Sequence, residues 1–252
     1  MYKRLAGILL LVLSLALGFI AYHDNELRKR TGRVNPGYLS SYSEVDSYEI
    51  NPETILTSIS KNEPSIFSPM VEDIGSIEPL AGSHFNFTQN DYLQIASALG
   101  KFVWNDPMNL DDWSIYWLLF EGECESEPTG FYLASIIYFK PIETNGRSAY
   151  TTRLVEIYPY LGLVQTGSGA KYPIPILSSW KKVNLVDAIT ADEAVQIADE
   201  NGGKEARLQA DSNLCSIYIH SPNYGKNDKW YVSYFGTGFE MYVPMKEVNF
   251  PW

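Results

Sequence analysis

Two stretches of the chain place apolar residues with the period of an amphipathic helix. In residues 189–203, ITADEAVQIADENGG, Thr190 precedes the apolar run and Glu193 follows three positions later. This Thr-x-x-Glu spacing is that of a capping box, in which the hydroxyl and the carboxylate each satisfy a free amide at the helix start. The apolar stripe consists of Ala194, Val195, Ile197 and Ala198. Gly202 and Gly203 then predict the helix end, because glycine takes the left-handed conformation without strain.

Residues 87–101, FTQNDYLQIASALGK, repeat this pattern at a constant offset of 102 positions. Thr88 and Asp91 match the capping pair, and Gly100 matches the terminating glycine. The tripeptide Gln-Ile-Ala at 94–96 is identical to the one that begins at Gln196. A capping signal, an identical tripeptide and a glycine in register are more than two unrelated amphipathic helices need to share. The sequence therefore predicts an internal duplication.

Each predicted helix is followed by runs that are rich in β-branched and aromatic residues and are separated by turn formers. After the first helix the runs are WSIYWLLFEG (113–122), FYLASIIYFK (131–140), AYTTRLVEIY (149–158) and LGLVQTG (161–167). After the second helix they are EARLQAD (205–211), LCSIYIHS (214–221), KWYVSYFG (229–236) and FEMYVPM (239–245). A helix packed on one face of a small antiparallel sheet is a minimal two-layer core. We therefore expect an α+β fold with two helix-plus-antiparallel-sheet modules in tandem behind an N-terminal hydrophobic helix.

The domain boundaries follow from these elements. The first module covers residues 86–167 and the second covers 189–252, with a connector that contains Gly and Pro at 168–188. Residues 23–85 are rich in Pro, Ser, Asn and Glu, which favours a tether with short structured pieces. One such piece is NPETILTSIS, in which Asn51 would cap a short helix that begins with proline.

The helix ITADEAVQIADENGG and the strands after it resemble the PepSY domain family, whose members are small extracytoplasmic modules with a leading helix followed by strands. The resemblance is best over residues 189–245 and weaker over 87–167. The chain departs from the family pattern at its end, MYVPMKEVNFPW, which lacks a common closing Asp-x-x-x-Gly turn, and in a longer insertion from Asp106 to Asp112. The family has no catalytic residues to carry over. It is associated with protease propeptides and with regulation or binding near the cell surface, so the resemblance implies a binding or inhibitory module.

The first residues predict a signal peptide or a membrane anchor at 1–22. Two basic residues precede an uncharged run of 17 residues from Leu5 to Ala21, at the lower limit for a membrane-spanning helix. Ala16-Leu17-Gly18 offers small residues of the kind that a signal peptidase reads. The basic residues at 28–33 would by themselves favour a cytoplasmic C-terminal region, but the short basic N-terminus favours export. We expect a single N-terminal span in the cell membrane with an extracytoplasmic C-terminal region, or alternatively a secreted protein.

Charge and composition narrow the range of partners. The chain has 30 acidic and 19 basic residues, which gives a net charge of −11. Because a chain this negative, without a basic stripe, repels a phosphate backbone, we expect no nucleic-acid partner. The 18 Tyr, 11 Phe and 6 Trp residues favour strands with buried rings. The alternative is an exposed aromatic platform for sugars or peptides.

Residue types that carry chemistry form no recognised site. No two of the three histidines stand at metal-ligand spacing. They are His23, His84 and His220. In EGECESE, residues 121–127, four carboxylates alternate around a cysteine, but a solvated acidic loop is favoured over a cation site. Gly167-Ser168-Gly169 lacks the strand-to-helix context of a nucleophile elbow or a phosphate loop.

The two cysteines, Cys124 and Cys215, fall one in each predicted module. In an exported chain they could form one bridge between the modules. We favour two separate buried thiols, because a free cysteine packs well inside a core. A catalytic cysteine would need an oriented histidine, which no pattern marks. The sequence therefore predicts no catalytic, cofactor-binding or metal-binding residue, and no cofactor.

These observations predict a non-enzymatic binding or regulatory protein that acts outside the cytoplasm on a peptide, a protein such as a protease, or a cell-wall ligand. The membrane is a further partner if the N-terminal helix is not cleaved. The alternative is an extracytoplasmic hydrolase or carbohydrate-binding protein that acts on glycan, with carboxylates and aromatic rings in the groove between the modules.

Overall fold

The structure is a computed structural model that describes residues 42–63, 66–70, 77, 79–80, 87–124, 130–144, 147–169, 172–173, 185, 187–210, 215–221 and 229–246. Within these ranges, no helix has both the length and the apolar character that a membrane span requires. The predicted signal or anchor at residues 1–22 lies outside them, as does most of the predicted connector at 168–188.

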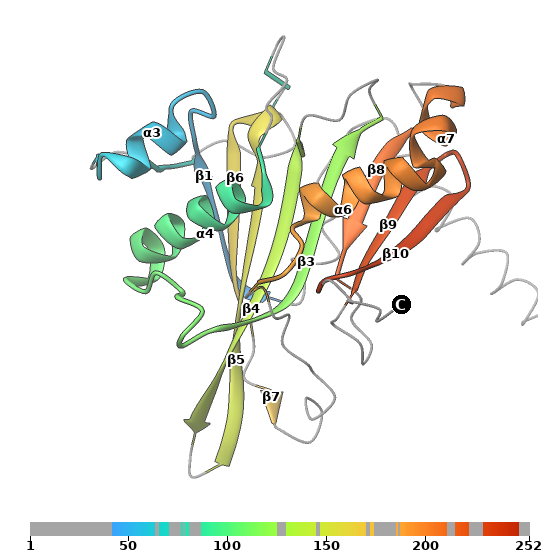
Figure 1. The fold of residues 1–252 in the computed structure, drawn as a ribbon. Helices are drawn as coiled ribbons and strands as arrows, with labels where there is room; N and C mark the ends of the chain where they lie inside the picture. The colour runs from blue at the N-terminus through green and yellow to red at the C-terminus, as the bar shows by residue number, and fades with distance from the viewer. Residues whose placement is uncertain are drawn as a thin grey trace, which may run out of the picture. The chain divides into compact units, whose positions relative to one another are not determined.

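One antiparallel sheet forms the framework of the described chain (Figure 1). Its strands follow the order β10-β9-β8-β3-β4-β5-β6-β1-β2, and β7 pairs with β5. The strands are β1 (Tyr42–Glu49), β2 (Ser68–Pro69), β3 (Ser114–Glu123), β4 (Leu133–Thr144), β5 (Arg147–Tyr158), β6 (Leu163–Gly169), β7 (Tyr172–Pro173), β8 (Ser216–His220), β9 (Lys229–Phe235) and β10 (Phe239–Pro244). The α-helices are α3 (Ile55–Ser60), α4 (Gln89–Trp104), α6 (Ala191–Ala198) and α7 (Lys204–Gln209). Sheet and helices together confirm the predicted α+β class.

Strands that follow two different helices meet near the middle of this sheet. We call α4 with β3–β6 the α4 segment, and α6 and α7 with β8–β10 the α6 segment. β3 pairs with β8 from Leu119↔His220 to Glu123↔Ser216. The two segments therefore share one continuous sheet, and α4 and α6 cover the same face of it (Figure 1).

The pairing of β3 with β8 explains a disulfide bond, which corrects the expectation of two separate thiols. Continuing the register one step beyond Glu123↔Ser216 places Cys124 opposite Cys215. Their Cα atoms are 5.4 Å apart and their sulfur atoms are bonded. No local pattern could reveal this contact, because the two cysteines are 91 positions apart in the sequence.

Both predicted capping boxes are confirmed. At the start of α4, Thr88 Oγ1 accepts the Asp91 N–H at 3.3 Å, and the Asp91 carboxylate accepts the Thr88 N–H at 2.9 Å. At the start of α6, Thr190 Oγ1 accepts the Glu193 N–H at 3.2 Å, and the Glu193 carboxylate accepts the Thr190 N–H at 2.7 Å. Each helix therefore begins with the same reciprocal pair of bonds.

The starts of the two helices also bind each other. The side-chain oxygen of Gln89 accepts the Ala191 N–H at 2.8 Å. The Asp192 carboxylate in turn accepts the Gln89 N–H at 2.9 Å. These bonds satisfy amides that a helix leaves free at its N-terminus, and they tie α4 to α6.

The predicted end of the first helix is wrong. α4 continues past Gly100 to Trp104, and Asn105 takes the left-handed conformation with φ 53°. Gly100 instead permits a close approach, because a Cβ at this position would lie 2.7 Å from the carbonyl oxygen of Asp106. The glycine was a packing signal rather than a stop signal.

The chain after α6 bends and returns to a helix, so the predicted strand EARLQAD is wrong. Gly202 has φ +101° in the bend, and Lys204–Gln209 form α7. Arg207 is buried in this helix and forms an ion pair with Asp199 at 2.7 Å. The Tyr234 hydroxyl donates to Asp199 at 2.6 Å. This long-range network selects the helix, because the short alternation Glu-Ala-Arg-Leu-Gln-Ala fits either structure.

The core lies between the helices and the sheet. α4 contributes Tyr92, Ile95 and Leu99, which are fully buried. α6 contributes mainly Ala194 and Ala198, whose small side chains let this helix lie close to the strands. The sheet contributes large side chains, among them Phe120, Ile136, Trp230, Val232 and Tyr234.

The region predicted as a tether contributes two strands. β1 pairs with β6, and β2 pairs with β1. The short helix α3 begins at Ile55 with Thr54 as its N-cap, later than predicted. The Asn51 side chain accepts the Glu53 N–H at 3.0 Å, so this residue forms a turn before the helix rather than its cap.

Candidate binding surface

The sheet face away from α4 and α6 carries one row of directly paired residues that crosses eight strands. From β10 to β1 the row is Tyr242, Tyr231, His220, Leu119, Ser135, Glu156, Gln165 and Ser47. Side chains directly opposed on antiparallel strands have Cβ atoms about 4.5–5.5 Å apart. The row is aromatic in the α6 segment, continues through Leu119 of β3, and is polar from β4 to β1.

At the β10 end, three rings of this row and two rings that flank it form a cluster, which we call the aromatic row. It consists of Trp117, Tyr218, His220, Tyr231 and Tyr242. The His220 ring stacks on Trp117, with 5.1 Å between centroids and 9° between planes. It also contacts Tyr218 at 5.4 Å and Tyr231 at 5.0 Å. Tyr231 and Tyr242 are 5.1 Å apart, so the rings form one contiguous surface.

Exposure increases along the aromatic row towards the edge of the sheet. Trp117 is 8% exposed, Tyr242 is 59% exposed, and the three rings between them are half-buried. The alternation of β8, β9 and β10 produces this surface, because it places Ile219, Val232 and Val243 in the core on the opposite face. The α6 segment thus has one buried face and one accessible face.

Trp117 reaches the aromatic row through a β-bulge. The register of β3 against β4 shifts between Ile115 and Trp117. Ile115 lies in the core, and regular alternation would place Trp117 there too. The extra residue of the bulge instead turns the indole to the other face. Sequence alternation therefore missed Trp117, whereas the spacing of Tyr218 and His220 by two positions was a usable signal.

Burial and hydrogen bonding set the charge state of the aromatic row. Burial lowers the pKa of the His220 imidazole below its usual range, so this ring is uncharged at neutral pH. Its Nδ1 lies 3.2 Å from the Ser221 carbonyl oxygen. Because a carbonyl only accepts, Nδ1 carries the proton and Nε2 is the acceptor. Burial raises the pKa of the Tyr231 hydroxyl, and the nearby Glu240 carboxylate raises it further.

A buried carboxyl lies at the polar end of the row. Glu156 is 5% exposed and accepts hydrogen bonds from Tyr158 Oη at 3.1 Å and from Ser135 Oγ at 3.4 Å. Burial raises the pKa of this carboxyl to about 7, although both hydrogen bonds oppose the shift. On the next strand, the side-chain oxygen of Gln165 is buried without a hydrogen-bond partner among the described residues. A protonated Glu156 would present a donor beside it.

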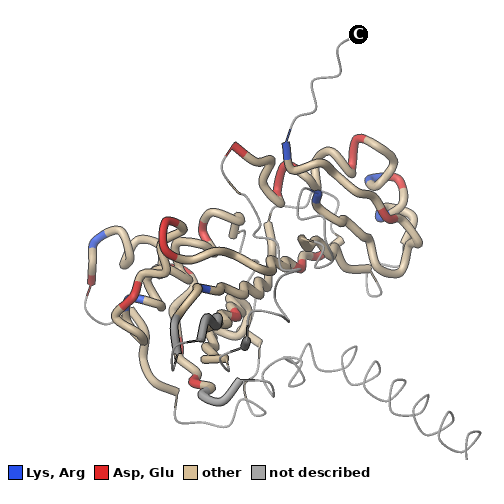
Figure 2. The backbone as a smooth tube through the Cα atoms, turned by 90° about the horizontal axis from the view of Figure 1, so that it is seen from below, with Lys and Arg blue, Asp and Glu red and all other residues tan. Residues whose placement is uncertain are grey.

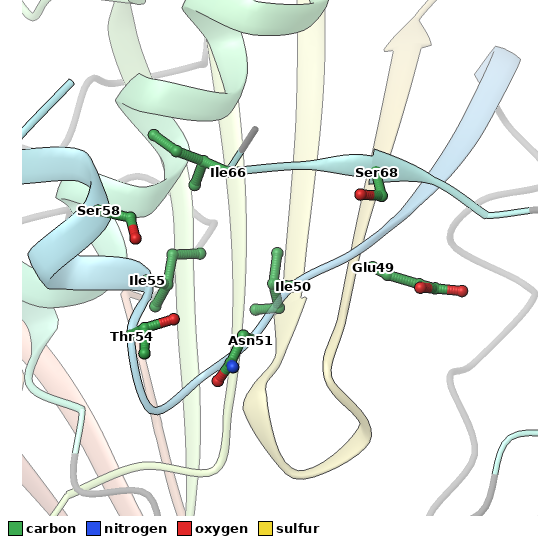
Figure 3. Close-up of a pocket in the computed structure, with 8 residues that line it drawn as sticks. All are labelled: Glu49, Ile50, Asn51, Thr54, Ile55, Ser58, Ile66 and Ser68. Carbon is green, nitrogen blue, oxygen red and sulfur yellow. The ribbon is translucent and has the colours of Figure 1, made fainter. Parts of the chain in front are cut away.

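Two hollows lie beside α3, away from the row. The first has a volume of about 270 Å³ and lies between the end of β1 and α3, where Ile50 and Ile55 line it (Figure 3). The second has a volume of about 600 Å³ and lies between α3 and α4, with Phe67 and Phe102 in its wall. Glu156 lines neither hollow, so the buried carboxyl does not face either of these openings.

Part of the acidic stretch 121–127 has structural roles, and the rest of it lies outside the described residues. Glu121 accepts a hydrogen bond from Tyr132 Oη at 3.2 Å. Cys124 is half of the disulfide. Residues 125–129 lie outside the described ranges.

The remaining candidates do not converge on a site. Gly167-Ser168-Gly169 belongs to strand β6. His23 and His84 lie outside the described residues, and His220 belongs to the aromatic row. In the part of the chain that the structure describes, no three His, Cys, Asp or Glu side chains come together as a metal ion would need.

Comparisons of this chain with protein-family models, with curated proteins and with solved structures find no match. The resemblance to the PepSY family therefore stays a prediction from the helix and strand pattern. The aromatic row is the feature of the described chain that best supports a function.

Proposed function

We propose that this chain is a non-enzymatic binding or regulatory protein that acts outside the cytoplasm and holds a peptide or protein segment on the aromatic row. The observation that carries the proposal is the accessibility of these rings. Rings that only fill a core are buried, whereas Tyr242 is 59% exposed and lies in contact with Tyr231. Tyrosine provides a large apolar contact area with a polar tip and loses little conformational entropy on binding.

Two observations support a location outside the cytoplasm. The Cys124–Cys215 disulfide is of a kind that forms and persists in oxidising compartments. The basic N-terminus and the apolar run from Leu5 to Ala21 have the pattern of an export signal. We propose a chain tethered by a single N-terminal span, or secreted if that span is cleaved.

We also propose that the α4 and α6 segments are tandem copies of one PepSY-like module. The matched capping boxes support this, and so does a second identical tripeptide at the same offset of 102 positions. The tripeptide is Ser114-Ile115-Tyr116 in β3 and Ser216-Ile217-Tyr218 in β8. β3 and β8 are the first strands of the two segments and pair with each other, as a two-fold axis between two copies would arrange them.

One observation favours the second candidate function, a glycan-acting hydrolase. A carboxyl with a pKa of about 7, such as that of Glu156, is suited to act as a general acid. However, Glu156 is 5% exposed and lines neither hollow beside α3. A substrate therefore lacks access to this carboxyl through the described residues, and binding to the aromatic row is the better-supported proposal.

A peptide array and a glycan array, each probed with the full-length chain in a mild detergent, test the proposal. We expect the chain to retain a subset of peptides, and the double variant Tyr231→Ala/Tyr242→Ala to lose about tenfold or more of that binding. The matched control is Leu208→Ala, which removes an exposed apolar side chain on α7. If the unaltered chain binds glycans and the double variant no longer binds them, the second candidate function is favoured. Hits that are insensitive to the double variant would contradict the proposal.

A further inference from the structure

Carboxylates lie beside the aromatic row on two strands. Glu240 of β10 is exposed, and its negative charge raises the pKa of the neighbouring Tyr231 hydroxyl. Glu121 of β3 lies directly opposite Tyr218 of β8. The chain as a whole carries a net charge of −11, and acidic positions are spread along the described backbone (Figure 2). A ligand of this surface is therefore favoured by positive charge and opposed by negative charge.

The rings themselves also favour a cation. A Lys or Arg side chain over the face of a tyrosine or tryptophan is attracted by the negative potential of that face. Tyr231 and Tyr242 lie 5.1 Å apart, and the negative charge of Glu240 acts on the first of them. This end of the aromatic row thus combines two ring faces with an anionic group. His220 adds no opposing positive charge at neutral pH, because burial lowers its pKa.

β10 is the last strand of the sheet in the described ranges, where it pairs with β9 alone. An edge strand presents backbone N–H and C=O groups to which a further strand can bind. Glu240 and Tyr242 lie on the face of the aromatic row, whereas Met241 lies on the helix-covered face against the core. The Met245 carbonyl accepts the Ile189 N–H at 2.7 Å, so the accessible stretch of this edge lies before it.

On the basis of the proposed function, we infer that the ligand is an extended peptide segment with alternating basic and apolar residues, which pairs with the edge of β10. Its Lys or Arg side chains lie on the face of Glu240 and Tyr242, because residues two apart on a strand share a face. Its apolar side chains lie on the opposite face, beside Met241. Opposite charges across neighbouring strands then stabilise the pairing and select its register.

Two residues of β10 also fit a different role, which is to protect this edge against pairing with other chains. A charged residue and a proline are common means by which an edge strand avoids pairing with other chains, and β10 has Glu240 and Pro244. The two interpretations differ for Glu240→Gln. Recognition of a basic segment predicts weaker binding of that segment. Protection predicts tighter binding of every peptide, whatever its charge.

Four fluorescent probes, titrated into the full-length chain in a mild detergent and followed by anisotropy, test the inference. Three are end-blocked hexapeptides in which valine alternates with lysine, with glutamate or with serine, and the fourth is an oligomer of N-acetylglucosamine. We expect the lysine peptide to bind most tightly and the glutamate peptide not to bind measurably. Raising the salt concentration from about 0.02 M to about 0.5 M weakens binding of the lysine peptide, because it shortens the Debye length.

Variants of β10 locate the binding. Tyr242→Ala is expected to weaken binding of the lysine peptide about two- to fivefold, the range of an exposed cation–π contact, whereas Tyr242→Phe retains the ring and the affinity. Glu240→Gln is expected to weaken it by up to about fivefold and to reduce its salt dependence. Leu208→Ala and Glu205→Gln, which alter exposed side chains on α7, are the matched controls and leave binding unchanged.

The outcomes separate this inference from the proposed function. If the serine or glutamate peptide binds as tightly as the lysine peptide, and Tyr242→Ala weakens it, the proposed function stands and the basic ligand is wrong. If the sugar oligomer binds through Tyr242 instead, the inference is wrong and the second candidate function is favoured. If no peptide binds in a way that depends on Tyr242, both are wrong. Tighter binding of every peptide by Glu240→Gln would leave edge protection as the role of that residue.

Discussion

The α4 and α6 segments begin alike and differ in the second face of their strands. In the α4 segment that face is closed: Leu154 and Leu163 are essentially inaccessible there, and Glu156 is 5% exposed. In the α6 segment the same face is accessible, and Tyr242 is 59% exposed. Strands that are buried on both faces contribute mainly to stability, whereas strands with one accessible face are free to bind. This is why we propose the α6 segment, and not the α4 segment, as the binding half of the sheet.

The helices of the two segments differ in a related way. α4 is one continuous helix of 16 residues whose buried side is mainly apolar, with the buried Gln89 at its start. In the α6 segment the helix bends near Gly202 and is held by the buried ion pair between Arg207 and Asp199, with Tyr234 as a further hydrogen-bond donor. Breaking one partner of such a pair is strongly destabilising, because the other charge stays buried. The helical part of the α6 segment therefore depends on a buried charge pair, whereas the buried side of α4 depends mainly on apolar packing.

Removing the disulfide has the largest expected effect and tests whether the segments are one folding unit. The double variant Cys124→Ala/Cys215→Ala opens a covalent loop that joins residues 91 positions apart. We expect the free energy of unfolding to fall by about 2–5 kcal/mol, since the unfolded chain is no longer constrained. Urea unfolding followed by tryptophan fluorescence measures the loss, and the reduced form of the unaltered chain should show the same loss. Two separate transitions in the variant would mean that the segments unfold independently.

Two side-chain truncations on the sheet face away from α4 and α6, one in each segment, test the difference in burial directly. Leu154→Ala opens a cavity at a fully buried position and should lower the free energy of unfolding by about 2–5 kcal/mol. Tyr242→Ala removes an exposed ring on the same face, and its effect should stay within about 0.5 kcal/mol. Chemical denaturation of both variants provides the comparison. Equal losses would contradict the division into a closed half and an accessible half.

The buried carboxyl of Glu156 in the α4 segment makes the stability of the chain depend on pH. The pKa of Glu156 is raised to about 7, so its protonated form contributes stability that is complete below about pH 4.5 and lost as the pH rises through 7. Glu156→Gln keeps an uncharged side chain at every pH. We therefore expect this variant to be more stable than the unaltered chain at pH 8, by up to about 3 kcal/mol, and similar to it at pH 5.

The difference in unfolding free energy between Glu156→Gln and the unaltered chain, measured from pH 5 to pH 8, isolates this carboxyl from all other titrating groups. Leu208→Ala is the control, because it alters an exposed side chain that does not titrate and should give a flat difference. A flat profile for Glu156→Gln would show that the carboxyl titrates normally. In that case the buried oxygen of Gln165 would lack the donor inferred for it.

Signals that act within a few residues made the helix starts, the strands and the α+β class predictable. Thr88 and Thr190 lie three positions from their capping partners, so the sequence contains both halves of each contact. The disulfide and the contact of Trp117 with the aromatic row were not predictable, because both depend on β3 lying beside β8. Trp117 was hidden by the bulge, which no alternation of residues encodes. His220 joins four other rings only when four strands are aligned.

The smallest expected effects concern the two helix starts, where the segments are most alike. Thr88→Ala and Thr190→Ala each remove a capping hydroxyl and should lower the free energy of unfolding by about 1 kcal/mol. Thr→Ser at either position keeps the oxygen and serves as the control. Similar losses at the two positions would support equivalent helix starts. A loss several times larger at Thr190 would mean that the likeness of the capping boxes does not extend to their energetics.

The double variant Thr88→Ala/Thr190→Ala sharpens this last test, because the two helix starts are in contact. Gln89 accepts the Ala191 N–H and donates its own N–H to Asp192, so loosening one start disturbs bonds of the other. We expect the loss in the double variant to differ from the sum of the single losses by about 0.5 kcal/mol or more. In a Gln89→Ala background, which removes the side-chain half of this contact, the difference should shrink. Additivity in both backgrounds would mean that α4 and α6 are stabilised separately, each by its own capping box.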